Sequence, residues 1–309
     1  MKKNILYILF LLQCLIGGTT WAFQKIGLQN SLPFWAAGMR FIIASTLIIL
    51  GLLISKKFKI NKKVLVISFL YGLMYFAFPF GSVYWASVYL PSGLISVLSS
   101  SISVFVLIFA ILINRTPTKN TQKVGTILCT IGIAIVFGDK LMMKGSLMEI
   151  VAMLIVLVAM IGSAFTTVIV KSKIKYLPFM TFTSLSMGFG GSFLLISSLV
   201  FEKGTRTFSG SNLISLIYLS IIASICGFCI NMHILKKWHV SKATAHLFVS
   251  PIIAIYIGVI FLRESLNSNI FWGTFFVIIG VMLINIKIDK RKILVIQSEQ
   301  KEKSTNEAS

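Results

Sequence analysis

The sequence predicts an all-α membrane protein of ten transmembrane helices, arranged as two inverted five-helix repeats. Three observations predict this fold: an apolar composition, apolar runs of span length, and basic residues that lie mostly in the loops. Of the 309 residues, 57% are hydrophobic and 12% are charged, which is more apolar than an average soluble chain. Transmembrane strands would alternate with a period of two, and the sequence shows no such alternation.

Ten apolar runs are long enough to cross the hydrocarbon core, which requires roughly 20 residues of helix. Short polar segments separate each run from the next. The predicted spans are 5–28, 33–55, 64–85, 91–113, 122–138, 147–170, 178–201, 213–235, 241–262 and 269–288. Residues 289–309 are charged and polar, and they predict a short cytoplasmic tail.

The formal charge of +21 raises the question of a polyanionic partner such as nucleic acid. Its placement argues against one. With the N-terminus inside, 22 of the 29 basic residues fall on the cytoplasmic side, five fall outside, and Lys25 and Arg40 lie within spans. This bias follows the positive-inside rule, so it predicts an inner-membrane protein of a bacterial type of cell with both termini cytoplasmic and no nucleic-acid partner.

Repeated motifs indicate an internal duplication. Leu32-Pro33-Phe34 opens the second span and Leu177-Pro178-Phe179 opens the seventh. Gly125-Thr126 in the fifth span recurs as Gly273-Thr274 in the tenth. The predicted repeats are residues 1–138 and 146–288, and an odd number of spans in each repeat turns the second copy over in the membrane.

Loop charges support this inversion, because equivalent loops of the two copies should then lie on opposite faces. The loop around Lys56 to Lys63 carries +5, whereas its counterpart from Glu202 to Asn212 carries +1. Residues 29–32 carry no charge, whereas residues 171–177 carry +3. Inverted repeats are a recurrent plan of alternating-access transporters, whose substrate sites lie near the midplane between the repeats.

Short motifs in five spans resemble the drug/metabolite transporter superfamily, and in particular the EamA-type ten-helix transporters. They are Gly18-Thr19-Thr20-Trp21-Ala22-Phe23-Gln24-Lys25, the stretch from Pro33 to Phe41, Ser250-Pro251 with Leu262-Arg263-Glu264, and the Gly-Thr openings of spans five and ten. The resemblance covers residues 5–288. It implies export or exchange of amino acids, drugs or related metabolites, with no cofactor. The fourth span departs from the family pattern, with Ser101 at the usual proline and Asn114 at the usual terminal glutamate.

Polar stripes at helical spacing are the candidate substrate-binding residues. Gln13, Thr20 and Gln24 form one stripe in the first span, and Ser96, Ser100 and Ser103 form another in the fourth. In the third span Tyr75, Phe78 and Ser82 follow one helix face, which predicts an aromatic, neutral pocket. Polar stripes should face inward, because lipid would leave their donors unpaired; ordinary helix packing is the alternative interpretation. Trp21, Arg40 and His246 complete the candidate set.

Two prolines and one arginine stand out inside the spans. Pro79 and Pro251 each remove a backbone donor, so they are candidate gates or simple kinks. Arg40 lies about 10 Å inside the second span, and it requires a partner, a wet cavity or a path to the headgroups.

These observations predict transport of a small solute, with efflux expected, by alternating access of the two halves. Passive channels and structural membrane subunits form one alternative class. A polytopic membrane enzyme is less favoured, because the chain holds eight acidic residues and none at the centre of a span, and no metal site is expected. The substrate, the coupling ion and the oligomeric state are left open by the sequence.

Overall fold

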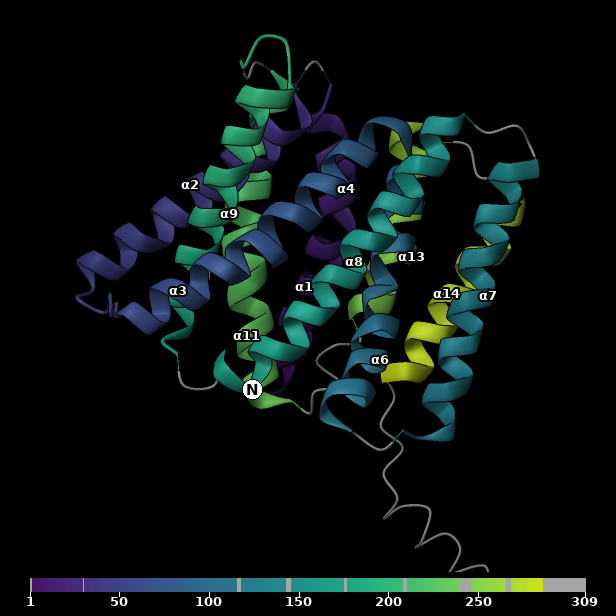
Figure 1. Ribbon diagram of the computed structural model, residues 1–309, viewed down its shortest axis with the longest axis horizontal. Helices are drawn as coiled ribbons and strands as arrows, with labels where there is room; N and C mark the ends of the chain where they lie inside the picture. Colours follow the sequence, from purple (N-terminus) through teal and green to yellow (C-terminus); the bar gives the residue numbers. More distant parts are fainter. Residues whose placement is uncertain are drawn as a thin grey trace, which may run out of the picture.

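The computed structural model describes residues 2–29, 31–115, 118–142, 146–174, 177–207, 210–238, 246–264 and 268–285. Within these residues every regular element is helical, and the helices form a bundle of ten spans (Figure 1). The first five are α1 (Lys2–Gly27), α2 (Pro33–Ile54), the run α3 (Lys62–Tyr71), η1 (Gly72–Ala77) and α4 (Phe78–Tyr89), the pair α5 (Ser92–Ser100) and α6 (Ile102–Asn114), and α7 (Asn120–Met142).

The second five spans follow the same order. They are α8 (Leu147–Ile174), α9 (Phe179–Phe201), the run α10 (Ser211–Ile217), η2 (Tyr218–Cys226) and α11 (Gly227–Lys237), then α13 (His246–Leu262) and α14 (Ser268–Asn285). Eight spans are apolar and at least 18 residues long, and Val249–Leu262 and Ser268–Ile284 are shorter apolar helices. The prediction of an all-α membrane protein with ten transmembrane helices is confirmed.

Local sequence explains several helix boundaries. Pro33 and Phe179 begin α2 and α9, each next to the Leu-Pro pair that marks the repeat. Asn61 caps α3, because its Oδ1 accepts a hydrogen bond from the Val64 backbone N–H at 2.8 Å. The third and eighth spans each contain a π-helical segment, η1 and η2, at the corresponding place in the repeat.

The packing of the spans shows the two-fold relation between the repeats. Helix α1 packs against α13, as its counterpart α8 packs against α6. Helix α1 also packs along α10, η2 and α11, as α8 packs along α4 and η1. The pairs α2 with α9, α7 with α14 and α5 with α13 bring equivalent spans of the two copies together. This exchange of partners is the arrangement expected for two inverted five-helix repeats.

Equivalent glycines let α7 and α14 approach closely. A Cβ on Gly132 would lie 2.5 Å from the Gly273 carbonyl oxygen, and one on Gly125 would lie 2.6 Å from that of Gly280. Small residues at such contacts allow helix backbones to pack against each other inside a membrane. The paired motifs that indicate the duplication therefore meet across the repeat interface.

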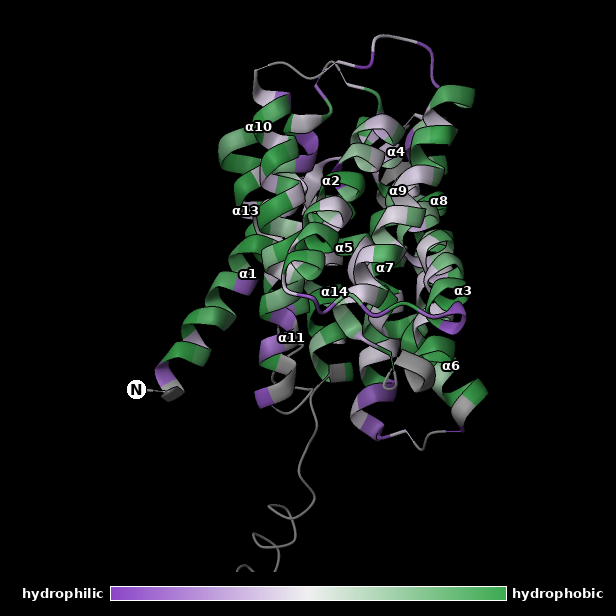
Figure 2. Cartoon of the chain, turned by 90° about the vertical axis from the view of Figure 1, so that its left-hand side faces the viewer, coloured by the Kyte–Doolittle hydropathy of each residue, from purple (hydrophilic) through white to green (hydrophobic). Residues whose placement is uncertain are grey.

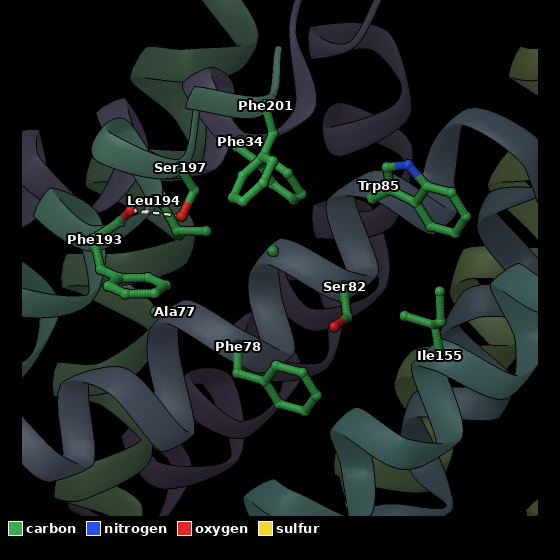
Figure 3. Close-up of a pocket in the computed structure, with 11 residues that line it drawn as sticks. Phe34, Ala77, Phe78, Ser82, Trp85, Ile155, Phe193, Leu194, Ser197 and Phe201 are labelled. Atoms are coloured by element: carbon green, nitrogen blue, oxygen red, sulfur yellow. Dashed lines mark hydrogen bonds between the residues drawn. The ribbon is translucent and has the colours of Figure 1, made fainter. Parts of the chain in front are cut away.

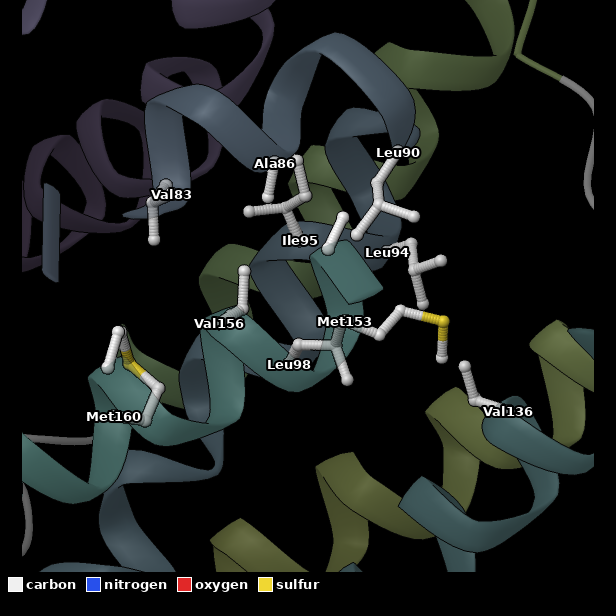
Figure 4. Packing of buried hydrophobic residues seen from close by; sticks show 12 residues of the cluster. Val83, Ala86, Leu90, Leu94, Ile95, Leu98, Val136, Met153, Val156 and Met160 are labelled. Carbon is white, nitrogen blue, oxygen red and sulfur yellow. The ribbon is translucent and has the colours of Figure 1, made fainter. Parts of the chain in front are cut away.

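The largest buried cluster joins the third and fourth spans to α8 (Figure 4). Leu90, Ile95, Leu98, Met153 and Val156 are fully or almost fully buried there. Exposed apolar side chains include Leu11 and Leu15 on α1 and Leu199 and Phe201 on α9, and Figure 2 colours most of the helices as hydrophobic. A surface of this kind suits hydrocarbon surroundings and not water.

Candidate functional site: an inner cavity between the repeats

An inner cavity of about 120 Å³ lies where α1, the third and fourth spans and α8 meet. Its described lining residues are Trp21, Tyr75, Pro79, Phe80, Val83, Ser99, Ile102, Met160 and Ser163. Met160 and Ser163 come from the second repeat and the others from the first. The cavity is therefore formed between the repeats, where inverted-repeat transporters hold their substrates.

Aromatic rings and hydroxyl groups make up most of the chemistry of this wall. Trp21 and Tyr75 offer an indole N–H and a phenol, and Ser99 and Ser163 offer hydroxyls. The Ser99 hydroxyl is buried and has no hydrogen-bond partner among the described residues. Because a buried hydroxyl without a partner is costly, Ser99 is available to a bound solute.

Arg40 lies behind this wall and is buried in the structure. Its Nε donates to the Ser224 hydroxyl at 3.0 Å, and its Nη1 donates to the Tyr84 hydroxyl at 3.4 Å. Its Cζ lies 5.5 Å from the centroid of the Phe80 ring, which separates it from the cavity. The structure thus gives Arg40 the partner that its depth requires and joins α2 to η2 and α4 through it.

The polar residues of α1 differ in their hydrogen-bond partners. Gln24 donates from Nε2 to the Ser87 hydroxyl at 2.7 Å, and Thr20 donates to the Ile16 carbonyl of its own helix at 2.6 Å. The Gln13 Oε1 is buried without a partner among the described residues. Of the candidate residues on this helix, Trp21 is the one that lines the inner cavity.

The serines of the fourth span divide in a similar way. Ser96, Ser100 and Ser103 are buried, and the Ser100 hydroxyl donates to the Val97 carbonyl at 2.6 Å. The Ser96 hydroxyl has no partner among the described residues. Ser99, on the neighbouring face, reaches the inner cavity instead. A stripe with steps of three and four residues does not include Ser99. The run Ser99-Ser100-Ser101 was the sequence signal that could have revealed it.

The third span divides its candidates between two cavities. Tyr75 and Pro79 line the inner cavity, whereas Phe78 and Ser82 line a larger one of about 330 Å³ between α2, α4, α8 and α9. Figure 3 shows Phe78 and Ser82 on α4, with Trp85 further along that helix. The π-helical η1 explains the division, because each i→i+5 turn adds a residue and rotates the following side chains by about 100°.

The remaining candidates lie near the contact between α1 and α13. His246 is buried at the start of the described part of α13, and Pro251 lies within that helix. A Cβ on Gly17 would lie 2.3 Å from the Ser250 hydroxyl oxygen, so the two helices touch one residue before Pro251. Neither His246 nor Pro251 is among the described residues that line the inner cavity.

Two carboxylates, absent from the candidate set, join helix ends of opposite repeats. Glu264, which follows α13, accepts from the Ser92 backbone N–H at 2.8 Å and from the Ser92 hydroxyl at 2.9 Å. Glu202, which follows α9, accepts from the Phe34 backbone N–H at 2.7 Å. Anions at helix N-termini satisfy free N–H groups and match the helix dipole. Lys25 complements this end by donating to the Leu90 carbonyl at 2.8 Å.

Metal ligation finds no support in the described part of the chain, where no three His, Cys, Asp or Glu residues lie close enough to hold an ion. The cysteines Cys14, Cys129, Cys226 and Cys229 are unpaired. The described wall of the inner cavity combines aromatic rings with hydroxyl groups. A wall of this kind binds a solute by its shape and by a few hydrogen bonds.

The chain belongs to the EamA-like transporter family, whose model matches it twice, at residues 4–138 and 150–286. It is thus a multi-pass membrane protein of a family that transports small solutes. An uncharacterized transporter of Buchnera aphidicola subsp. Schizaphis graminum is 26% identical over 299 residues, covering 96% of this chain and 99% of the relative. Uncharacterized transporter YoaV of Bacillus subtilis is 25% identical over 285 residues, covering 90% of this chain and 96% of the relative.

Two further similarities agree with this placement. An uncharacterized transporter of Clostridium kluyveri is 27% identical over 302 residues, covering 94% of this chain and 95% of the relative. A solved structure described as a crystal structure of a protein matches with a TM-score of 0.65 and 11% identity, covering 91% of this chain and 97% of that one. The last likeness supports the fold alone.

Proposed function

We propose that the protein exports a small neutral or zwitterionic metabolite, such as an amino acid or a drug-like solute, by alternating access of its two repeats. The observation that carries this proposal is the inner cavity between the repeats, with aromatic walls and the unpaired Ser99 hydroxyl. None of its described lining residues is charged. A polyanion would find no cation there, whereas a neutral solute gains apolar contact and a few hydrogen bonds.

Alternating access requires an end of the bundle that opens and closes. The contacts of Glu264 with Ser92, and of Lys25 with the Leu90 carbonyl, join α13, α5, α1 and α4 at one end. The loop charges assign that end to the outside of the cell. In this proposal these bonds hold the outer end closed, and they break when the solute leaves.

The orientation follows the same charges, with an inner-membrane location and both termini in the cytoplasm. Single cysteines test it at exposed positions of opposite loops. Thr205→Cys should react with an impermeant thiol reagent added outside intact cells, and Asn61→Cys should react only after lysis. Labelling of both from outside would contradict the inverted arrangement of the loops.

The test of function begins with untargeted metabolomics of medium from cells that express or lack the gene. A solute that accumulates outside expressing cells is then measured as flux in proteoliposomes of the purified full chain. Tyr75→Ala and Ser99→Ala should lower flux at least tenfold at equal protein content, because they remove cavity contacts. Thr130→Ala is the control, since its exposed hydroxyl on α7 bonds to the Thr126 carbonyl of the same helix and lines neither the inner nor the 330 Å³ cavity.

Three outcomes would contradict the proposal. Full flux in both cavity variants would move the site elsewhere. Flux that neither saturates nor supports counterflow would favour a passive channel. Chemical turnover of a solute by the purified protein, without vesicle transport, would favour a membrane enzyme.

A further inference from the structure

A third cavity, of about 290 Å³, lies on the outside of the bundle between the third span and α8. We call it the α3–α8 groove. Its described lining residues are Ile67, Leu70, Tyr71, Met74, Gly162, Phe165, Thr166, Ile169 and Val170. It lies apart from the inner cavity, with which it shares no lining residue.

The polar groups of Thr166 and Tyr71, which line the groove, have hydrogen-bond partners within the protein. The Thr166 hydroxyl donates to the Gly162 carbonyl of its own helix at 2.8 Å. The Tyr71 ring stacks on Tyr75, with ring centroids 4.6 Å apart. Apolar cavities of this kind do not hold water, so an apolar occupant is favoured.

The groove opens toward the lipid and not toward the interior. Leu70, Met74 and Phe165 are 55%, 51% and 46% exposed, and they lie at membrane depth within two spans. Phe78 closes the groove toward the neighbouring 330 Å³ cavity, where its ring lies 3.7 Å from the position of a Cβ on Gly162. The surrounding solvent at this depth is the acyl chains of the bilayer.

The equivalent seam of the other repeat shows what a filled groove looks like. There Tyr218 of η2 stacks on Phe23 of α1 with centroids 3.9 Å apart. The Tyr218 hydroxyl also lies 2.6 Å from the Thr19 hydroxyl. Protein side chains fill that seam, whereas in the α3–α8 seam the rings of Tyr71 and Phe165 line an open groove.

Positive charge collects where the groove opens. Lys62 and Lys63 begin α3 and are exposed, and they precede Ile67 and Leu70 of the groove on the same helix. Figure 1 shows α3 and α8 diverging toward the beginning of α3. Basic clusters beside transmembrane helices on the cytoplasmic side attract anionic lipid headgroups.

We infer that the α3–α8 groove binds one acyl chain of an anionic phospholipid, whose headgroup is held by Lys62 and Lys63 at the start of α3. The inference rests on the membrane location of the chain and is independent of the proposed substrate. The bound chain supplies the packing that Tyr218 and Phe23 supply in the other seam.

Native mass spectrometry of the delipidated full chain tests this binding. The probes are dioleoyl phosphatidylglycerol and dioleoyl phosphatidylcholine, which share acyl chains and differ in headgroup charge. At equal concentration the wild type should retain phosphatidylglycerol about tenfold better. Gly162→Leu and Met74→Trp fill the groove and should abolish this difference; the second variant covers a failure of the first to fold.

Matched controls separate the groove from the general lipid surface. Leu199→Phe enlarges an exposed side chain on α9 and should leave phosphatidylglycerol binding unchanged. Lys62→Gln with Lys63→Gln should reduce it at least threefold, whereas Lys57→Gln with Lys59→Gln, in the preceding loop, should not.

Several results would overturn the inference. Equal retention of the two lipids by the wild type would remove the headgroup site. Undiminished binding in both folded groove variants would remove the acyl-chain site. A dimeric mass that the groove variants convert to monomer would show that a second copy of the chain covers this face instead.

Discussion

The two seams between the repeats differ, although the duplication makes them equivalent. On one side η2 closes against α1 through the stacked rings of Tyr218 and Phe23. On the other side α3 and η1 leave a groove against α8, lined by Leu70 and Phe165. A duplicated backbone therefore keeps its helix pairing while the side chains of the two copies are free to differ.

This difference indicates which side of the bundle is tightly packed and which side is loosely packed. The inner cavity also lies on the open side, between α1, the third and fourth spans and α8. The side that Tyr218 and Phe23 close, and the close contact between α7 and α14, are packed more tightly. Motion in an alternating-access cycle is expected to use the loosely filled side first.

The largest expected effect comes from removing the aromatic stack between η2 and α1. Tyr218→Ala removes the ring stack on Phe23 and the hydroxyl contact with Thr19, and it should lower the free energy of unfolding by about 3 kcal/mol. Leu70→Ala, in the exposed seam, should cost less than about 1 kcal/mol. Unfolding in mixed micelles measures both. Equal losses would mean that the two seams are equally packed.

The next effect concerns the interface where the two copies remain alike. Gly132→Ala would place a methyl group 2.5 Å from the Gly273 carbonyl oxygen, so α7 and α14 must separate. Overpacking of this kind costs about 2 kcal/mol. Gly138→Ala is the control on the same helix, because a Cβ there meets no atom within 4 Å. A Gly132→Ala protein with the free energy of unfolding of the wild type, measured in the same mixed micelles, would show that α7 and α14 can separate at little cost.

A smaller effect is expected at the charged helix end. Glu264→Gln replaces charge-assisted bonds to Ser92 with neutral ones and should cost about 1.5 kcal/mol. The fourth span ends in Asn114 at the corresponding place, so the first copy has no carboxylate there. Arg263→Gln is the control, since that neighbouring residue is exposed. If both variants lose the same free energy of unfolding, the Glu264 carboxylate stabilises the protein no more than an exposed charge does.

The sequence was sufficient to predict the ten spans, their order and the duplication, because apolar length and loop charge decide them. It was insufficient for the faces of the third span. Spacing places Tyr75, Phe78 and Ser82 on one face, but η1 rotates the later two away from the inner cavity. A π-helical turn leaves no mark in a hydrophobic pattern, so the stripe could not reveal it.

Contacts between distant residues were the other limit. Depth alone indicated that Arg40 requires a partner, but Ser224 lies 184 residues away in the sequence. The sequence indicated that no carboxylate lies at the centre of a span, but it did not reveal that Glu202 and Glu264 bind the helix N-termini of other spans. Such pairs depend on how the repeats dock, which no local spacing contains.

The smallest expected effect tests whether the fourth and ninth spans share a break. The ninth span has Pro251 after Ser250, and the fourth has Ser101 after Ser100. Helix α5 ends at Ser100 and α6 begins at Ile102, so the backbone turns at Ser101 without a proline. Proline at this position would continue the repeat pattern.

Ser101→Pro should cost less than about 1 kcal/mol, far below the roughly 3 kcal/mol of proline in a helix interior. The Ser101 N–H bonds to the Leu98 carbonyl at 3.1 Å, so the bond lost is a turn bond. The Val97 carbonyl, four residues before, already accepts from the Ser100 hydroxyl at 2.6 Å. Val104→Pro, inside α6, is the control and should prevent folding or unfold at far lower denaturant. Equal damage by both substitutions would show that Ser101 lies in an ordinary helix and that the two copies do not share this break.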